Sequence, residues 1–194
     1  MQPHDAVSVV EQLRQTTFLR LFQAVDDSAV NRIWGDGRAR NALQAVVRDA
    51  AAESGIRFLA AEILLVKDPG YPPSEDRAAL SEIYAMALKN APAVMANPWG
   101  LPGMFDGQIA GHVLRLGEAG VAPLRPLLDD PSPVVFSGSK DATYGNRYAW
   151  RVKDIAASLI ARIRNLPFVP DPEPAARDQL IAHLKSTLDS TPRS

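Results

Sequence analysis

The chain has 194 residues, of which 46% are apolar and 22% charged, so it can bury a substantial core and is too apolar to be disordered throughout. Its 21 Lys and Arg nearly balance its 22 Asp and Glu, and a net charge of -1 with a pI near 6.3 argues against nucleic acid as a partner. The absence of cysteine excludes disulfides, thiolate metal sites and cysteine nucleophiles.

The first 15 residues lack the pattern of a secretory signal, which is a basic segment followed by an unbroken apolar core. No stretch of the sequence approaches the roughly 18 consecutive apolar residues of a membrane span. We therefore expect a cytoplasmic protein with no membrane contact.

Apolar residues recur at helical spacing almost everywhere, and the alternation typical of strands is nearly absent. Clusters of Pro and Gly at residues 69–73, 92–103, 123–133 and 167–174 separate the periodic segments. The sequence therefore predicts an all-α fold of about seven to eight helices.

In chain order, the predicted elements are an N-terminal cap helix over residues 6–25, three helix pairs, and a last helix over residues 175–188. We expect these elements to form one domain, residues 1–194. The cap helix and its loop take up residues 1–38, and the three helix pairs take up residues 39–67, 76–117 and 118–164. Residues 165–194 form the connector, the last helix and the tail.

Two segments of the chain share a pattern. Residues 56–64 and 152–160 both read as apolar, basic, two spacers, Ala-Ala, spacer and two apolar residues, and residues 108–117 are a looser copy. Small alanines allow a neighbouring helix to approach closely, so the pattern favours stacked helix pairs.

Residues 116–130, LGEAGVAPLRPLLDD, carry a more specific pattern. In the HEAT-repeat family, which includes short bacterial variants, such a stretch ends one repeat and opens the next, with a proline in the first helix and an Asp-rich turn. The chain resembles this family over residues 39–164. The resemblance implies a small α-solenoid, but no particular activity.

Two of the three pairs depart from that pattern, because long insertions separate their helices at residues 92–104 and 131–150. We call these the first and the second insertion. Adjacent repeats would place both insertions at the same edge of a solenoid, so we expect them to lie side by side.

The first insertion contains the rigid turn sequence NPWGLPG, in which prolines fix the backbone and glycines permit left-handed conformations. Trp99 in this turn would serve as an anchor for a partner if it were exposed. The alternative is that Trp99 folds back and covers the helix ends.

The second insertion collects hydroxyls, glycines, aromatics and cations in SGSKDATYGNRYAW. Its free amides and the start of the next helix could hold a small anion such as phosphate or a carboxylate. The alternative is a self-satisfied loop, in which Asp141 pairs with Arg147 or Arg151 while Tyr144, Tyr148 and Trp150 cover core.

Catalytic and metal motifs are missing from the sequence. His4, His112 and His183 are scattered, with no second ligand at metal-binding spacing, so we expect no metal and no cofactor. HEAT-type metalloenzymes carry paired His-Glu dipeptides, and this chain has none, which excludes that class.

The sequence therefore favours a non-catalytic binding or scaffold module that uses the aromatic and basic edge formed by the two insertions. Aromatic rings would supply apolar contact, and the arginines would take carboxylate or phosphate groups. We expect a protein partner before a small anionic ligand. The candidate binding residues are Trp99, Tyr144, Asn146, Arg147, Trp150 and Arg151.

Two alternatives remain. One is an enzyme with Asp141 or Asp154 beside His112 under the insertions, for example a HEAT-like enzyme that excises alkylated bases from DNA, although the low pI argues against that example. The other is a structural protein whose insertions pair across a homodimer.

Overall fold

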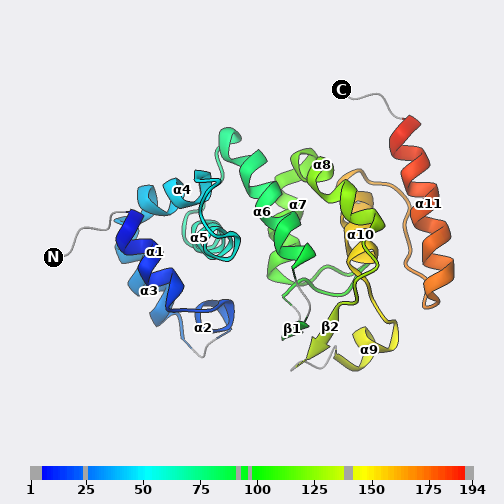
Figure 1. Cartoon of the computed structure of the whole chain (residues 1–194), viewed down its shortest axis with the longest axis horizontal. Helices are drawn as coiled ribbons and strands as arrows, with labels where there is room; N and C mark the ends of the chain where they lie inside the picture. Colours follow the sequence, from blue (N-terminus) through cyan, green and yellow to red (C-terminus); the bar gives the residue numbers. More distant parts are fainter. Residues whose placement is uncertain (1–5, 24–25, 91–92, 96–97, 138–141, 191–194) are drawn as a thin grey trace. The chain divides into compact units, whose positions relative to one another are not determined.

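The computed structural model describes residues 6–23, 26–90, 93–95, 98–137 and 142–190, whose regular elements are helices apart from one pair of three-residue strands (Figure 1). The all-α class is thereby confirmed, whereas the solenoid arrangement stays a prediction. Among the described residues, no helix has the length and apolar character that crossing a membrane requires. The chain divides into two compact units, residues 1–87 and 88–194, and whether they form one domain stays a prediction.

The N-terminal unit is built from helices and two short 3-10 turns. In order these are α1 (Ala6–Arg14), α2 (Phe18–Phe22), α3 (Ser28–Trp34), η1 (Gly35–Gly37), α4 (Arg40–Arg48), α5 (Ser54–Lys67), η2 (Ser74–Asp76) and α6 (Arg77–Lys89), whose last two residues belong to the other unit.

The single cap helix expected over residues 6–25 is broken into two. Helix α1 ends at Arg14, and the hydroxyl of Thr17 accepts the N–H of Arg20 at 3.3 Å, which starts α2 as an N-cap does. A further helix, α3, occupies part of the predicted loop. Apolar periodicity continues across the break, so periodicity alone did not locate it.

The core of the N-terminal unit lies between α4 and α5. Leu43 and Val47 of α4 and Ala60 and Ile63 of α5 are fully buried. The guanidinium of Arg57 donates two hydrogen bonds to the carbonyl of Val47, at 3.1 and 2.9 Å, and so closes the end of α4. The basic position of the repeated pattern thus ties one helix of the pair to the other.

The C-terminal unit contains the two strands and the remaining helices. These are β1 (Ala93–Met95), α7 (Gln108–Leu116), η3 (Gly117–Gly120), α8 (Val121–Leu124), η4 (Arg125–Asp129), β2 (Val135–Ser137), α9 (Ala142–Arg147), α10 (Val152–Ile163) and α11 (Pro174–Ser190).

Helix α10 is the centre of this unit. Every residue from 154 to 161 is buried, and the helix contacts α7, α8, η4 and α11. Ala156 and Ala157 are fully buried, as expected of the small residues in the repeated pattern. The first helix of this pair is irregular, changing between 3-10 and α turns over residues 117–129, because Pro123 and Pro126 cannot donate backbone hydrogen bonds.

The predicted last helix is confirmed as α11. It buries Ile181, Leu184 and Leu188 along one narrow stripe. Its outer turns are held by ion pairs, because Lys185 pairs with Asp129, and Asp189 with Arg125. The helix therefore docks on the unit through both apolar and charged contacts.

Candidate functional site

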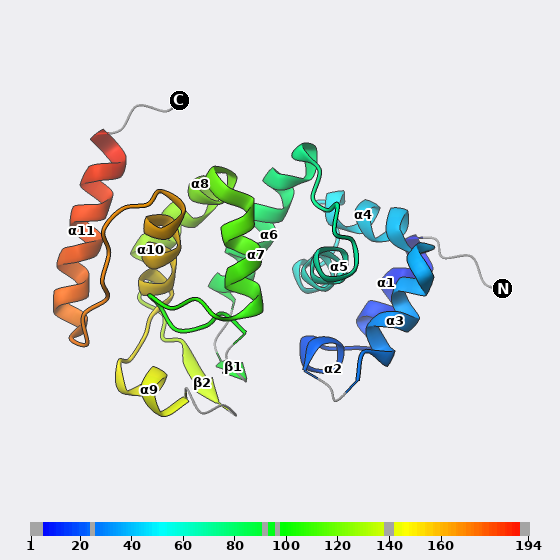
Figure 2. The same ribbon diagram turned by 180° about the vertical axis from the view of Figure 1, so that it is seen from behind.

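The two insertions are joined by main-chain pairing. Strand β1 of the first insertion runs parallel to β2 of the second, with Val94 opposite Phe136. In Figures 1 and 2, β1, β2 and α9 gather at the same end of the C-terminal unit. The expectation that the insertions lie side by side is therefore confirmed.

Asn146 fixes the second insertion from within. Its side-chain amide accepts the N–H of Phe136 at 2.9 Å and donates to the carbonyl of Phe136 at 2.8 Å, as a neighbouring strand would. The preceding residue, Gly145, lies flat on the buried Phe136 ring, since a Cβ there would come within 2.4 Å of it. The Gly-Asn pair therefore packs α9 against β2, and the Asn146 amide is occupied.

Trp99 lies inside the protein and is only 2% exposed. The backbone beside it passes very close to the segment that leads into α7, because a Cβ on Gly107 would lie 2.4 Å from the carbonyl oxygen of Pro98. The same carbonyl accepts the N–H of Ile109 at 2.8 Å. Trp99 is therefore not an exposed anchor, and its ring folds back into the protein as the alternative interpretation predicts.

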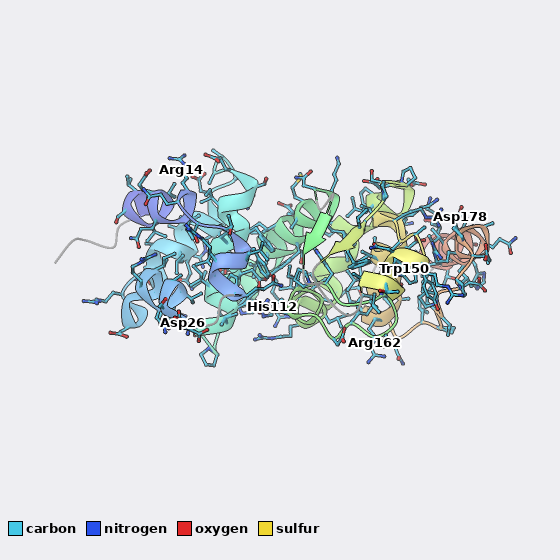
Figure 3. The ribbon with its side chains drawn as sticks, turned by 90° about the horizontal axis from the view of Figure 1, so that it is seen from below. Arg14, Asp26, His112, Trp150, Arg162 and Asp178 are labelled. Carbon is cyan, nitrogen blue, oxygen red and sulfur yellow. The ribbon has the colours of Figure 1, made fainter. Side chains whose placement is uncertain are left out.

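Trp150 is also buried, at 4% exposure, and does not offer a free face. The ring of Tyr148 stacks on it with centroids 5.1 Å apart and planes 7° apart, and the guanidinium of Arg177 lies 4.6 Å from the Trp150 centroid. Figure 3 shows Trp150 in the same part of the unit as Asp178 of α11. The aromatic part of the second insertion thus packs on α11.

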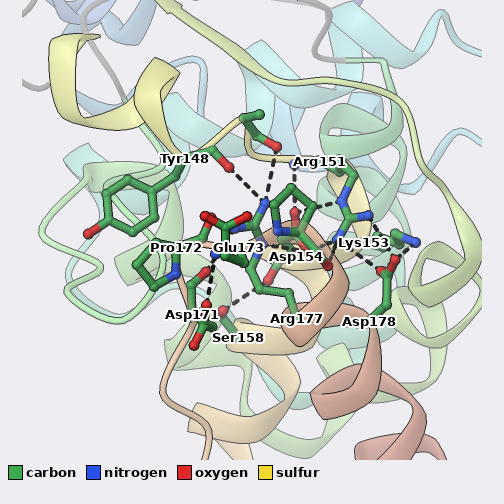
Figure 4. A network of polar contacts seen from close by, with 12 residues as sticks. Tyr148, Arg151, Lys153, Asp154, Ser158, Asp171, Pro172, Glu173, Arg177 and Asp178 are labelled. Atoms are coloured by element: carbon green, nitrogen blue, oxygen red, sulfur yellow. Dashed lines mark hydrogen bonds and ion pairs between the residues drawn. The ribbon is translucent and has the colours of Figure 1, made fainter.

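Arg177, on α11, is completely buried and joins three segments (Figure 4). It donates to the carbonyls of Asp171 and Pro172, both at 2.8 Å, and to those of Tyr148 and Ala149, at 2.8 and 3.2 Å. Its Nε lies 3.2 Å from a carboxylate oxygen of the buried Asp154. Because Ala149 has a left-handed φ of 47°, these bonds also hold a backbone conformation that alanine rarely adopts.

Arg151, which the sequence proposes as a ligand for a partner's anion, is occupied within the unit. Its Nε and Nη2 donate a bidentate pair of hydrogen bonds to the carboxylate of Asp154, at 3.0 and 2.9 Å. Its Nη2 also lies 2.9 Å from a carboxylate oxygen of Asp178 on α11. Asp178 also pairs with Lys153 at 2.7 Å. Asp154 in addition accepts the backbone N–H of Arg151 at 2.9 Å, which fixes the start of α10.

Two charged members of this network have shifted pKa values. Hydrogen bonds from Lys153 and Arg151 lower the pKa of Asp178, and the bond to Asp154 raises the pKa of Arg151. Both groups therefore keep their charges at neutral pH, and the carboxylate of Asp154 lies against two guanidinium groups. These ion pairs hold the end of the second insertion against α10 and α11.

The remaining predicted site residues are divided between exposed and undescribed positions. Arg147 is exposed at the end of α9, and no carboxylate among the described residues pairs with it. The side chain of Tyr144, and residues Lys140 and Asp141, lie outside the described residues. Among the side chains of the insertions that the structure describes, the large apolar ones that are exposed are Met104 and Val135, at 69% and 47% exposure.

Sequence reasoning missed Arg177, Asp154 and Asp178 as members of this cluster. Asp154 carries a local signal, since an acid three residues after a helix start is typical of a capped N-terminus. Arg177 carries none, because its acceptor carbonyls lie as far as 29 residues away.

Among the described residues, no three His, Asp or Glu side chains come together as metal ligands would. No protein-family model, no curated protein and no solved structure matches this chain.

Proposed function

We propose that the chain is a non-catalytic binding module built from HEAT-like helix pairs, and that it binds a partner protein through the outer surface of the two insertions. The anchoring of the insertions is the observation that carries this proposal. A loop that only connected two helices would need neither a strand pair nor a buried arginine beneath it.

The supporting argument is one of preorganisation. Asn146, Trp150 and Arg177 hold the described parts of the second insertion in place, so a partner that binds there meets a surface that is already ordered and loses less conformational entropy on binding. These three residues thus act as supports, and binding falls to the other side chains on the outside.

The outer side chains have the character of a protein-binding surface. Met104 and Val135 are exposed apolar side chains of the insertions, and Arg147 is an exposed cation with which no carboxylate of the described residues pairs. Arginine and methionine are both enriched in interfaces relative to the rest of the protein surface.

The test is affinity capture from source cells with two variants compared side by side. The first variant combines Met104→Ser, Val135→Thr and Arg147→Ala, and the matched control is Val66→Ser, which changes an exposed valine of the N-terminal unit. We expect a captured protein that the triple variant loses and the control keeps. Identical capture by all three proteins contradicts the proposal.

Light scattering separates a partner protein from a second copy of the chain. If the wild type is a dimer and the triple variant is a monomer, the insertion surface binds a second copy of the chain. That result would contradict the binding of a different partner protein through this surface.

A further inference from the structure

A second surface lies on the N-terminal unit, beside α1. An open hollow of about 500 Å³ lies between α1 and the end of α4, and we call it the α1–α4 groove. Its volume falls within the roughly 300–1,000 Å³ of ligand-binding clefts. Its apolar residues are Val7, Val10, Ala45, Val46 and Ala52, and its charged residues are Glu11, Arg14 and Asp49.

The apolar residues of the groove are not fully used by the core. Val9 and Leu13 fill the inward face of α1, so the unit does not need Val7 for its interior. Val7 is nevertheless 80% exposed, and Ala45 is exposed on α4.

The charges around the groove are predominantly negative. Arg14 (Figure 3) is already paired with Glu53 at 2.9 Å, and its other nitrogen lies 4.0 Å from Glu11. With Glu53 included, three carboxylates stand against two guanidinium groups, that of Arg14 and that of Arg57, which donates to the carbonyl of Val47 at the end of α4. The nearest cation of α4, Arg48, does not offset them, because it pairs with Asp76 at 2.5 Å and with Glu75 at 3.7 Å.

Asp49 adds to the negative potential through its position. It is the C-cap of α4, where an acidic side chain is unfavourable for the helix, although the carbonyl of Val47 in the last turn accepts from the guanidinium of Arg57. The side chain does accept the N–H of Ala51 at 2.9 Å, a role that asparagine would fill without the charge.

From this juxtaposition we propose that the α1–α4 groove binds a basic amphipathic helix of a partner protein. Aliphatic side chains at i, i+3 and i+4 spacing would enter between α1 and α4, and flanking Lys or Arg would face Glu11 and Asp49. The groove belongs to the N-terminal unit, so the proposal does not rest on the insertion surface.

The probe is a fluorescein-labelled helical peptide of 18 residues, with leucines on one face and lysines flanking it, compared with a twin in which every lysine is glutamate. We expect the basic peptide to bind at least about tenfold more tightly in low salt, and the difference to shrink as salt rises. Equal binding of the twins, or no binding of either, overturns the proposal.

Variants of the chain locate the site. Glu11→Lys combined with Asp49→Asn removes the negative potential while keeping the acceptor for Ala51, and it should abolish or reverse the preference for the basic peptide. Val7→Ser should weaken binding of the basic peptide by about tenfold, whereas Val66→Ser should leave it unchanged. A preference that survives the charge change places the peptide elsewhere and overturns the proposal.

Two controls distinguish the remaining explanations. The insertion triple variant should bind the peptide as the wild type does, so failure of one surface does not imply failure of the other. If light scattering shows a wild-type dimer that Val7→Ser converts to a monomer, the groove pairs two copies of this chain and the basic-helix proposal is wrong.

Discussion

The second insertion and helix α1 differ in the use of their conspicuous residues. The insertion is rich in aromatic and polar side chains, and several that the structure describes make their contacts within the C-terminal unit: Trp150 is buried, and the amide of Asn146 is hydrogen-bonded to Phe136. Helix α1 has an ordinary sequence, yet it leaves Val7 in solvent in a groove that Glu11 and Asp49 also line. Aromatic and polar residues in a long loop can therefore serve to anchor the loop. Exposed apolar side chains, such as that of Val7, are then the better candidates for binding a partner.

The comparison predicts that the largest loss of stability follows from Arg177→Met. This change leaves four carbonyls without their donor and removes one of the two guanidinium partners of Asp154. Breaking a buried pair of this kind costs about 3–5 kcal/mol, so the urea midpoint should fall sharply.

The matched control for that prediction is Arg164→Met, which removes a solvent-exposed pair with Glu118 in the same unit. We expect it to cost about 1 kcal/mol or less. Equal losses in the two variants would mean that Arg177 does not anchor the insertion.

Two glycine substitutions should have effects of opposite sign. Gly145→Ala forces a methyl group against the Phe136 ring and should cost about 1–3 kcal/mol. Gly111→Ala lies in α7, where nothing is within 4 Å of the added Cβ, and should stabilise by about 0.5–1 kcal/mol. Thermal unfolding measures both, and a stabilising Gly145→Ala would contradict the packing of α9 on β2.

Asn146→Ala tests the anchoring of β2 directly. It removes both side-chain bonds to Phe136 and should destabilise the unit by about 1–3 kcal/mol. The exposed Thr143→Ala in the same helix should change the unfolding free energy by less than about 0.5 kcal/mol. Indistinguishable urea curves for the two variants would show that the amide of Asn146 is dispensable.

The smallest effect concerns Asp178, whose pKa is lowered below its ordinary value of 3.8 by Lys153 and Arg151. A carboxylate with a lowered folded-state pKa stabilises the protein above its unfolded-state pKa, and that contribution is lost as the pH falls through the folded-state value. Because the side chain is 46% exposed, the contribution is at most about 1 kcal/mol.

Asp178→Asn should therefore be slightly less stable than the wild type at about pH 7, and the difference should shrink at a pH well below the ordinary value of 3.8. Urea unfolding at the two pH values measures it. A difference that stays constant between them would assign the effect of the substitution to something other than charge.

Much of the fold could be predicted from local patterns. Helix α11 and the second helices of two pairs, α5 and α10, follow the expected periodicity, and the Ala-Ala positions are buried as the repeated pattern requires. That the two insertions lie side by side was also predicted, from the assumption of adjacent repeats, but their pairing as parallel strands was not. These features depend on residues near one another in the chain or on a regular stacking rule.

The interior of the site could not be predicted in the same way. Whether Trp99 and Trp150 face solvent depends on what covers them, and Trp150 is covered by Arg177 from α11, 27 residues further along the chain. The amide of Asn146 could bind a ligand or a strand equally well, and the choice depends on where Phe136 lies. Long-range contacts of this kind leave no mark in periodicity or spacing.

Hydrogen exchange of the second insertion tests the central claim most directly, since the claim is that the insertions are a rigid support for a binding surface. The amide of Val134 donates to Trp150, that of Phe136 to Asn146, and that of Val152 to Ser132. We expect these amides to be protected nearly as well as those inside α10. Exchange at the rate of an open loop, while α10 stays protected, would contradict the account.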